Sequence, residues 1–357
     1  LLVLLVYWAR YKFRNKGFLT HLLLFSLATF SVSAVWFLAE VIVHGPQFVQ
    51  EFVAYQIRLF STPDAGHRGF FGYHVVVLLI GCFPVSVFAL PNLWGDRQPE
   101  DEMLESNTLV TCQRSDLTTW MQILFWVVLI LFSIVRTKIV HYSSLAYFPI
   151  TYLGVYTIWR AMRWDVRPRV VAVLLPTLGV LIGSVQMLIP LIGQNLHLLK
   201  PYLAADPFAQ ARLDIAVDWH WWHGLPGAVL VIASVAAWLY WQRNEAWKAA
   251  QTVFTGGAVF VAFTLVLCIN NIEQYSQGST IEFYESKVGE DCFVKPVGFK
   301  SYAHLFYTQK PPVAGDTAVD DYETLAHGQP GKTVYFVAKI TNLKDLPDLP
   351  GCRELYR

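Results

Sequence analysis

Long apolar runs separated by short polar connections fill most of the chain up to Asn270. Each run approaches the ~20 residues that an α-helix needs to cross a bilayer. Proline and glycine inside them, such as Pro84 and Pro149, are expected to be tolerated, because neighbouring membrane helices can satisfy the freed backbone groups. The pattern predicts an α-helical polytopic membrane protein with seven full spans and a partial first one: Phe18–Val43, Phe70–Leu90, Thr118–Val135, Tyr142–Trp159, Val170–Ile192, Trp221–Trp241 and Thr252–Ile269, preceded by Leu1–Ala9.

The pattern changes after Asn270, where the apolar runs become short. Alternating β-branched and aromatic residues there indicate strands, and turn-forming residues separate them. The predicted elements are strands at Cys292–Phe299 and Thr333–Ile340, helices at Thr280–Lys287 and Tyr302–Thr308, and a loop at Pro311–Gly331. We therefore expect a transmembrane domain over residues 1–271 and a small C-terminal α/β domain over residues 272–357.

The composition agrees with a membrane protein. Hydrophobic residues make up 55% of the 357 residues and charged residues only 15%. The 13 Trp and 17 Tyr suit the aromatic belts found where membranes meet water. A net charge of +1 without a long basic run gives no indication of nucleic-acid binding.

The distribution of basic residues predicts how the spans are oriented. Alternate connections between spans carry twelve basic residues against six, and the richer set is expected in the cytoplasm. The richer set is Arg10, Lys12, Arg14, Lys16, Arg97, Arg114, Arg160, Arg163, Arg167, Arg169, Arg243 and Lys248, and the poorer one is Arg58, Arg68, Arg136, Lys138, Lys200 and Arg212. The connection holding Lys138 and the C-terminal domain are then both predicted to be extracytoplasmic.

The short connection Arg136–Ser144 is the strongest candidate for chemistry. Charge held at the edge of a membrane bundle is costly and is often kept for function. Lys138 as a point charge and Arg136 as a fork of donors could clamp a phosphate, with Tyr142 donating a hydrogen bond to the same oxygens. The alternative is that both cations extend to lipid headgroups.

A second candidate is the Gly-rich segment Gly66–His74, which follows a predicted outer loop, Gly45–Asp64. Its small residues allow close backbone approach to a ligand. The imidazoles, the guanidinium and the helix start there could receive a phosphate through His67, Arg68, Tyr73 and His74. The alternative is a hinge whose His67 and Arg68 meet headgroups, and Asp64 is expected to serve the turn.

Other polar positions are open to two interpretations. Glu40 is expected to pair with a cation of a neighbouring helix or to face a cavity. The segment Asp218–His223 suits a metal through its two His, but its three Trp favour an interfacial belt. Gln194, Asn195 and His197 are plausible cavity lining. Cys292 and Cys352 could form a disulfide if the C-terminal domain is extracytoplasmic, while no Cys-x-x-Cys or His-Glu-x-x-His pattern indicates a metal site.

The run Ser133-x-x-x-x-Lys138-x-x-x-Tyr142, followed by Tyr147-Phe148-Pro149, resembles a signature of polytopic glycosyltransferases. That family includes bacterial aminoarabinose transferases and protein O-mannosyltransferases, which take a sugar from a polyprenyl-phosphate carrier on the outer side of the membrane. The resemblance implies that the Lys138–Tyr142 connection lies near the carrier phosphate. It covers most of this chain but only the later part of the family's transmembrane domain.

The resemblance implies an inverting glycosyltransferase of the bacterial inner membrane that needs no metal or other cofactor. Its partners would be a polyprenyl-phosphate sugar and a lipid, protein or glycan acceptor. The family's general-base Asp lies in a first outer loop that this sequence does not contain, so the chain is expected to be an N-terminally truncated fragment. Two alternatives remain. A flippase or transporter for an anionic lipid would use the same basic cavity and would be expected to show repeats and discontinuous helices; a lipid-linked polymer ligase would change only the acceptor.

Overall fold

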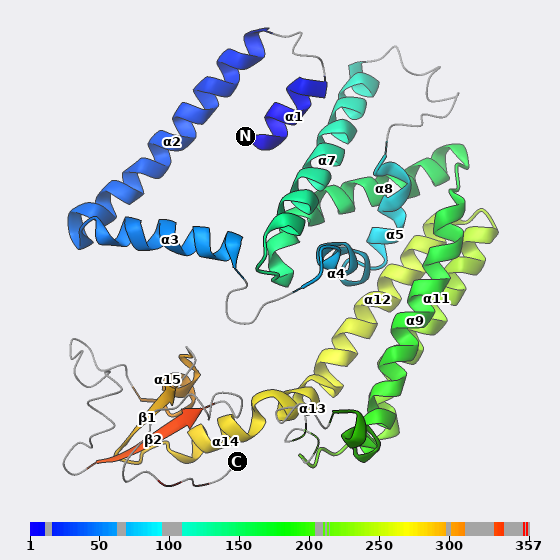
Figure 1. Cartoon of the computed structure of the whole chain (residues 1–357). Coiled ribbons are helices and arrows are strands. Elements are labelled where there is room, and N and C mark those ends of the chain that lie inside the picture. Colours follow the sequence, from blue (N-terminus) through cyan, green and yellow to red (C-terminus); the bar gives the residue numbers. More distant parts are fainter. Residues whose placement is uncertain are drawn as a thin grey trace. The chain divides into compact units, whose positions relative to one another are not determined.

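The computed structural model describes residues 1–10, 16–62, 69–94, 109–203, 210, 213, 215–297, 301–310, 332–338, 353 and 355. Helices dominate this part of the chain (Figure 1). Within it, five helices are long and apolar enough to cross a membrane. They are α2 (Lys16–His44), α7 (Leu109–Ile134), α9 (Arg169–Gln194), α11 (Leu225–Gln242, preceded by the 3₁₀ turn Trp221–Gly224) and α12 (Ala246–Leu267).

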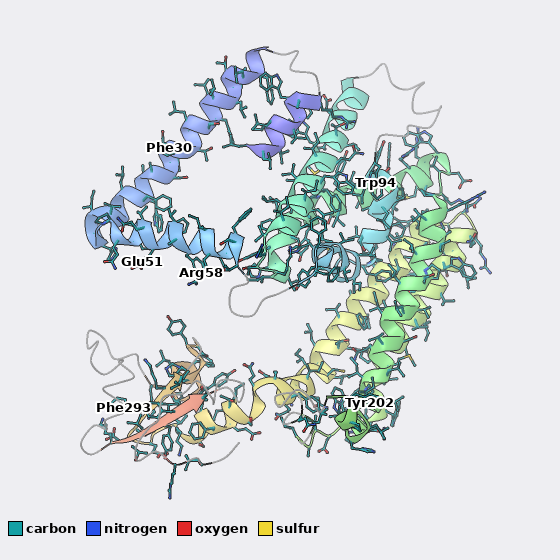
Figure 2. The ribbon with its side chains drawn as sticks, in the orientation of Figure 1. Phe30, Glu51, Arg58, Trp94, Tyr202 and Phe293 are labelled. Carbon is teal, nitrogen blue, oxygen red and sulfur yellow. The ribbon has the colours of Figure 1, made fainter. Side chains whose placement is uncertain are left out.

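Helix α2 shows why these helices belong in a bilayer. It is apolar around its whole circumference. Phe30, labelled in Figure 2, is 72% exposed, and Ile42 is 82% exposed. Exposing such side chains to water costs ~25 cal/mol per Å² of apolar surface, a cost that lipid removes. The predicted α-helical polytopic membrane fold is therefore confirmed.

The predicted span Phe70–Leu90 is broken in the structure. It forms α4 (Tyr73–Gly81) and α5 (Val85–Ala89), and the two halves are bent by 110°. Pro84 lies at the break, where its ring and missing N–H prevent the helix from continuing. The prediction of one continuous span over Phe70–Leu90 is wrong, and a sixth span is counted only if the bent pair is taken as one.

The predicted span Tyr142–Trp159 also differs from the structure. Residues Val140–Ala146 form a 3₁₀ turn, and helix α8 begins at Tyr147 and ends at Trp164. It is not among the helices that meet the length and hydropathy of a span, so the predicted total of seven full spans is not confirmed. Pro149 lies in the first turn of α8, where a missing N–H breaks no helical bond.

Helix α8 lies between two buried clusters. Its residue Ile158 packs with Phe88 of α5 and with Leu175 and Trp241 of α9 and α11. Another part of α8 joins the cluster formed by α4, α5 and α7. Gly154 permits the approach of α5, because a β-carbon there would lie 2.8 Å from the carbonyl oxygen of Val85. Because α8 is covered by protein, it does not need the uniform apolar surface of a lipid-facing helix.

The predicted outer loop Gly45–Asp64 is largely helical. Helix α3 (Gln47–Ser61) follows α2 after Gly45, whose φ of 80° ends the preceding helix (Figure 1). Apolar residues occupy one broad arc of α3 and polar residues the other, and none of its residues is buried. This pattern is typical of a helix that lies in the membrane interface. The prediction of a loop was wrong, although Phe48, Phe52, Tyr55 and Leu59 recur at the helical period of 3.6 residues.

The chain divides into two compact units, residues 1–185 with 227–260, and residues 186–226 with 261–357. The second unit contains the C-terminal strands β1 (Cys292–Val297) and β2 (Thr333–Ala338), which pair in parallel with Cys292 opposite Thr333. Helices α14 (Ser279–Ser286) and α15 (Ala303–Tyr307) accompany them, and Tyr284 of α14 packs on Cys292 and Val294.

The strand and helix positions agree with the sequence prediction within three residues at each end. The helical backbone runs on from α12 through α13 (Ile269–Glu273) and a π-helical turn to α14, so a domain boundary at 271/272 stays a prediction. Cys352 and the predicted loop Pro311–Gly331 lie outside the described residues. The proposed Cys292–Cys352 disulfide therefore remains untested.

Candidate functional site

The segment Val135–Lys138 closes the C-terminal end of helix α7. The ammonium group of Lys138 donates hydrogen bonds to the backbone oxygens of Phe132, at 2.9 Å, and Ser133, at 2.7 Å. The last carbonyls of a helix have no partner within the helix, and a cation there also complements the helix dipole. Lys138 is only 5% exposed, and burial lowers the pKa of its ammonium group. The lysine is therefore fixed in place by a structural role.

The same segment also closes the C-terminal end of α3. The backbone N–H of Arg136 donates to the carbonyl of Phe60 at 3.2 Å, and that of Thr137 donates to Leu59 at 3.4 Å. The Thr137 hydroxyl, which is fully buried, donates to the carbonyl of Thr62 at 2.8 Å. Residues 136–138 thus join the ends of two helices that are far apart in the sequence.

His74 of α4 lies beneath this junction. Its imidazole is fully buried, and Nδ1 lies 3.1 Å from the hydroxyl of Ser143, which donates to the carbonyl of Val140. Both bonds are satisfied when Nδ1 carries the proton. Nε2 is then a buried acceptor for which the described residues provide no hydrogen-bond donor. His74 holds the connection in place through Ser143. Because its side chain is fully buried, it cannot contact a ligand directly.

A cavity of about 370 Å³ opens beside Lys138. It is lined by Gly69, Phe71, Ser133, Ile134, Val135, Arg136 and Lys138. Arg136 is exposed, and within the described part of the chain no carboxylate pairs with Arg136 or Lys138. The cavity therefore presents two cationic side chains on a largely apolar wall, and one of them, Lys138, is already bonded to the end of α7.

Gly69 brings the Gly-rich segment to this cavity. A β-carbon at Gly69 would lie 2.7 Å from Cγ of Lys138 and 3.2 Å from the ring of Tyr73. The ring of Tyr142 packs on Phe132 of α7, 5.5 Å between centroids, and Tyr142 is not among the residues that line the cavity. The structure thus gathers Arg136, Lys138, Tyr73 and Gly69, while the candidates His67 and Arg68 lie outside the described residues.

The other polar candidates contact residues of the protein itself. Glu40 pairs with His44 of its own helix, 2.8 Å from Nδ1, so the expected cation of a neighbouring helix is not its partner. In the second unit, the His220 backbone N–H donates to Nδ1 of His223, and Trp221 is 72% exposed, as an interfacial residue would be. Among the described residues, no three His, Cys, Asp or Glu side chains gather as metal ligands. Gln194 donates to the Trp219 carbonyl at 2.8 Å.

Sequence reasoning missed the residues that hold the site together. Thr137 carries no motif signal, and its partners belong to α3, which was expected to be loop. Ser143 lies within the predicted connection, and its position three residues after Val140 is typical of a hydroxyl that bonds back to the chain. A helical-period analysis of residues 47–61 would have revealed α3 and hence a helix end beside this connection.

No model of a known protein family matches the chain, and no curated protein matches it either. Among solved structures, the crystal structure of ArnT from Cupriavidus metallidurans bound to undecaprenyl phosphate matches 94% of this chain with a TM-score of 0.52. The chain has the ArnT fold. The two sequences are 17% identical, so the match concerns the fold alone, and the chain spans 56% of the length of ArnT. The resemblance to polyprenyl-phosphate sugar glycosyltransferases is thereby confirmed at the level of the fold, and the chain is a multi-pass membrane protein.

Proposed function

We propose that this chain forms the carrier-binding part of a glycosyltransferase that moves a sugar from a polyprenyl phosphate to an acceptor on the outer face of the inner membrane. The observation that carries the proposal is the cavity with two cationic side chains, Arg136 and Lys138, at the end of a membrane helix, in a fold shared with a protein whose structure is bound to undecaprenyl phosphate. A phosphate monoanion or diester fits this charge, and an apolar chain can extend from it along the surrounding helices.

The chemistry asked of these residues is the stabilisation of a leaving group. An acceptor oxygen attacks the anomeric carbon of the sugar, and the bond from that carbon to the phosphate oxygen breaks. The phosphate leaves with the bonding electrons, so negative charge increases on its oxygens as the reaction proceeds. Arg136 and Lys138 meet that charge, while a general base removes the acceptor's proton.

The fixed position of Lys138 suits this role. Two of the three donors of its ammonium group bind the carbonyls of α7, which leaves one for a phosphate oxygen. Because the helix already holds the side chain, carrier binding does not need to restrict its rotamers, a cost of up to ~2 kcal/mol for a free lysine. His74 also holds the connection in place through its hydrogen bond with Ser143.

The experiment is sugar transfer by the full-length protein in proteoliposomes that contain a labelled polyprenyl-phosphate sugar. Arg136→Gln is the sharper variant, because no hydrogen bond of the Arg136 side chain supports the fold in the described residues. Losing a charged hydrogen bond to the phosphate should lower transfer by about 10- to 100-fold, with an unchanged melting temperature. Lys138→Gln should lower transfer further, and Lys248→Gln, which removes an exposed cation paired with Glu245, is the matched control. Transfer within two-fold of wild type in both site variants would refute the proposal.

The alternative of a flippase is favoured by one observation, the break between α4 and α5. The same proteoliposomes separate the two. Movement of the labelled carrier between leaflets without sugar transfer, in the presence of a suitable acceptor extract, would support the flippase and count against the transferase.

A further inference from the structure

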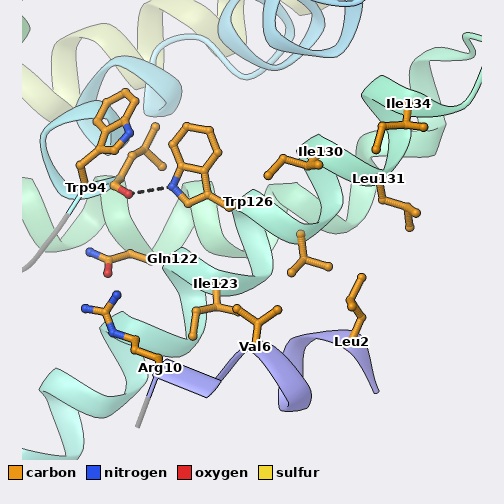
Figure 3. Close-up of a pocket in the computed structure, with 12 residues that line it drawn as sticks. Leu2, Val6, Arg10, Trp94, Gln122, Ile123, Trp126, Ile130, Leu131 and Ile134 are labelled. Atoms are coloured by element: carbon orange, nitrogen blue, oxygen red, sulfur yellow. Dashed lines mark hydrogen bonds between the residues drawn. The ribbon is translucent and has the colours of Figure 1, made fainter. Parts of the chain in front are cut away.

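A second cavity lies between α1 (Leu2–Arg10) and α7 (Figure 3). Its volume is about 580 Å³, and its wall is built from side chains such as Val6 of α1 and Ile123, Val127 and Ile130 of α7. The two helices supply these residues at spacings of three and four, so the cavity is a groove that runs along α7.

The length and the lining of the groove suit a hydrocarbon chain. Its lining on α7 extends from Gln122 to Ile134, which at 1.5 Å per residue is about 18 Å. That is roughly half of the ~30 Å hydrocarbon core, or about one leaflet. Apart from Arg10 and Gln122, the lining side chains are aliphatic or aromatic, and a single acyl chain is a slender apolar group of matching length.

One end of the groove carries charge. Arg10 is the charged residue among the described lining residues, and it lies beside Gln122 (Figure 3). The Gln122 amide donates to the Asn92 carbonyl and the Trp126 indole donates to the Leu93 carbonyl, so these lining groups already have partners. The described residues offer Arg10 no carboxylate. An exposed guanidinium at the mouth of an apolar groove is complementary to an anionic headgroup above an acyl chain.

Trp94 lies at the same end of the groove as Arg10 and indicates that this end is at the membrane interface. Its indole is 63% exposed and lies 5.4 Å from the ring of Trp126, in the position of an interfacial aromatic residue. Arg10 also belongs to the set of basic residues that the charge distribution predicts to be cytoplasmic. The opposite end of the groove, at Ile134, borders the cavity of Arg136 and Lys138. A headgroup at Arg10 and a carrier phosphate at Lys138 would therefore lie at opposite ends of the groove.

We propose that this groove binds one acyl chain of an anionic glycerophospholipid, with its headgroup phosphate held by Arg10. This inference does not depend on the proposed transferase activity. It concerns a lipid of the leaflet opposite to the one that would present the carrier, and it assigns Arg10 to lipid binding.

The test is native mass spectrometry of the full-length protein released from nanodiscs that contain phosphatidylglycerol and phosphatidylcholine with identical acyl chains. One basic residue near anionic lipid should give the wild type about a five-fold preference for retained phosphatidylglycerol. Arg10→Gln should abolish that preference, and Val127→Trp should remove the retained lipid of either kind by filling the groove. Arg243→Gln, an exposed arginine of the same predicted side, is the control and should behave as wild type.

Three results would overturn the proposal: no lipid retained by the wild type, an Arg10→Gln protein with the wild-type preference, or a correctly folded Val127→Trp protein with undiminished lipid. The first would mean that another segment of the full-length protein occupies the groove. The headgroup comparison in Arg10→Gln does not depend on the bulky variant, so the proposal can be tested even if Val127→Trp fails to fold.

Discussion

Replacing Lys138 with Met removes the cation that closes α7 while keeping the side chain's length and apolar stem. The structure gives the expected cost. The ammonium makes two hydrogen bonds to α7 carbonyls, and bonds to charged groups contribute at least ~1.5 kcal/mol each, so the variant should lose about 3 kcal/mol of unfolding free energy. That loss corresponds to a change of more than one hundred-fold in the ratio of folded to unfolded protein.

The measurement is denaturant unfolding in detergent micelles for wild type, Lys138→Met and Lys248→Met. Lys248 is a suitable control because its side chain is 60% exposed and its ammonium pairs with Glu245 at the surface. Its replacement should cost less than ~1 kcal/mol. If Lys138→Met is as stable as Lys248→Met, the ammonium does not hold the end of α7, and the argument that helix bonding fixes the lysine beside the cavity fails.

The remaining predictions concern other parts of the same framework. Gly69→Ala places a β-carbon 2.7 Å from Cγ of a lysine that is held at its far end, so it should cost ~1–3 kcal/mol and weaken carrier binding, as ligand-induced shifts in melting temperature would show. Thr137→Val leaves the carbonyl of Thr62 without its hydroxyl donor, and amide hydrogen exchange over residues 59–62 should become faster; unchanged exchange would show that α3 is not held through Thr137. In the C-terminal part, hydrogen bonds from Lys287 and Tyr335 lower the pKa of Glu290. The stabilisation that these bonds give the folded state is complete above the ordinary glutamate pKa of ~4.3, and it is lost as the pH falls through the lowered pKa. Thermal unfolding of Glu290→Gln between pH 7 and pH 3 should therefore depend less on pH than that of wild type.

The sequence predicted the elements whose pattern is strong on a local scale. Helix α2 is apolar over its whole length, and the strands at Cys292 and Thr333 carry the alternation that a small sheet requires. It also predicted that Arg136 and Lys138 follow the end of a membrane helix. These properties depend on a few neighbouring residues, which is why a single sequence suffices to find them.

The remaining features depend on what packs against each element. Helix α8 has too few apolar residues for a lipid-facing span, and only its burial between two clusters explains how it can lie within the helical domain. The sequence does not say which neighbouring groups would bond to the backbone freed by Pro84, so the bend there could not be predicted. Nothing in the sequence indicates that the Lys138 side chain turns back to the carbonyls of Phe132 and Ser133.

The two bonds from Lys138 to the end of α7 bear on how related sequences should be interpreted. A lysine that closes a helix will be retained by selection for folding alone, including in homologues that have lost catalysis. Its presence in an alignment column is therefore poor evidence that a relative is an active enzyme. Arg136 is the better diagnostic residue, because its exposed side chain makes no hydrogen bond that supports the fold among the described residues. Its replacement should mark the branches that have lost the proposed sugar transfer.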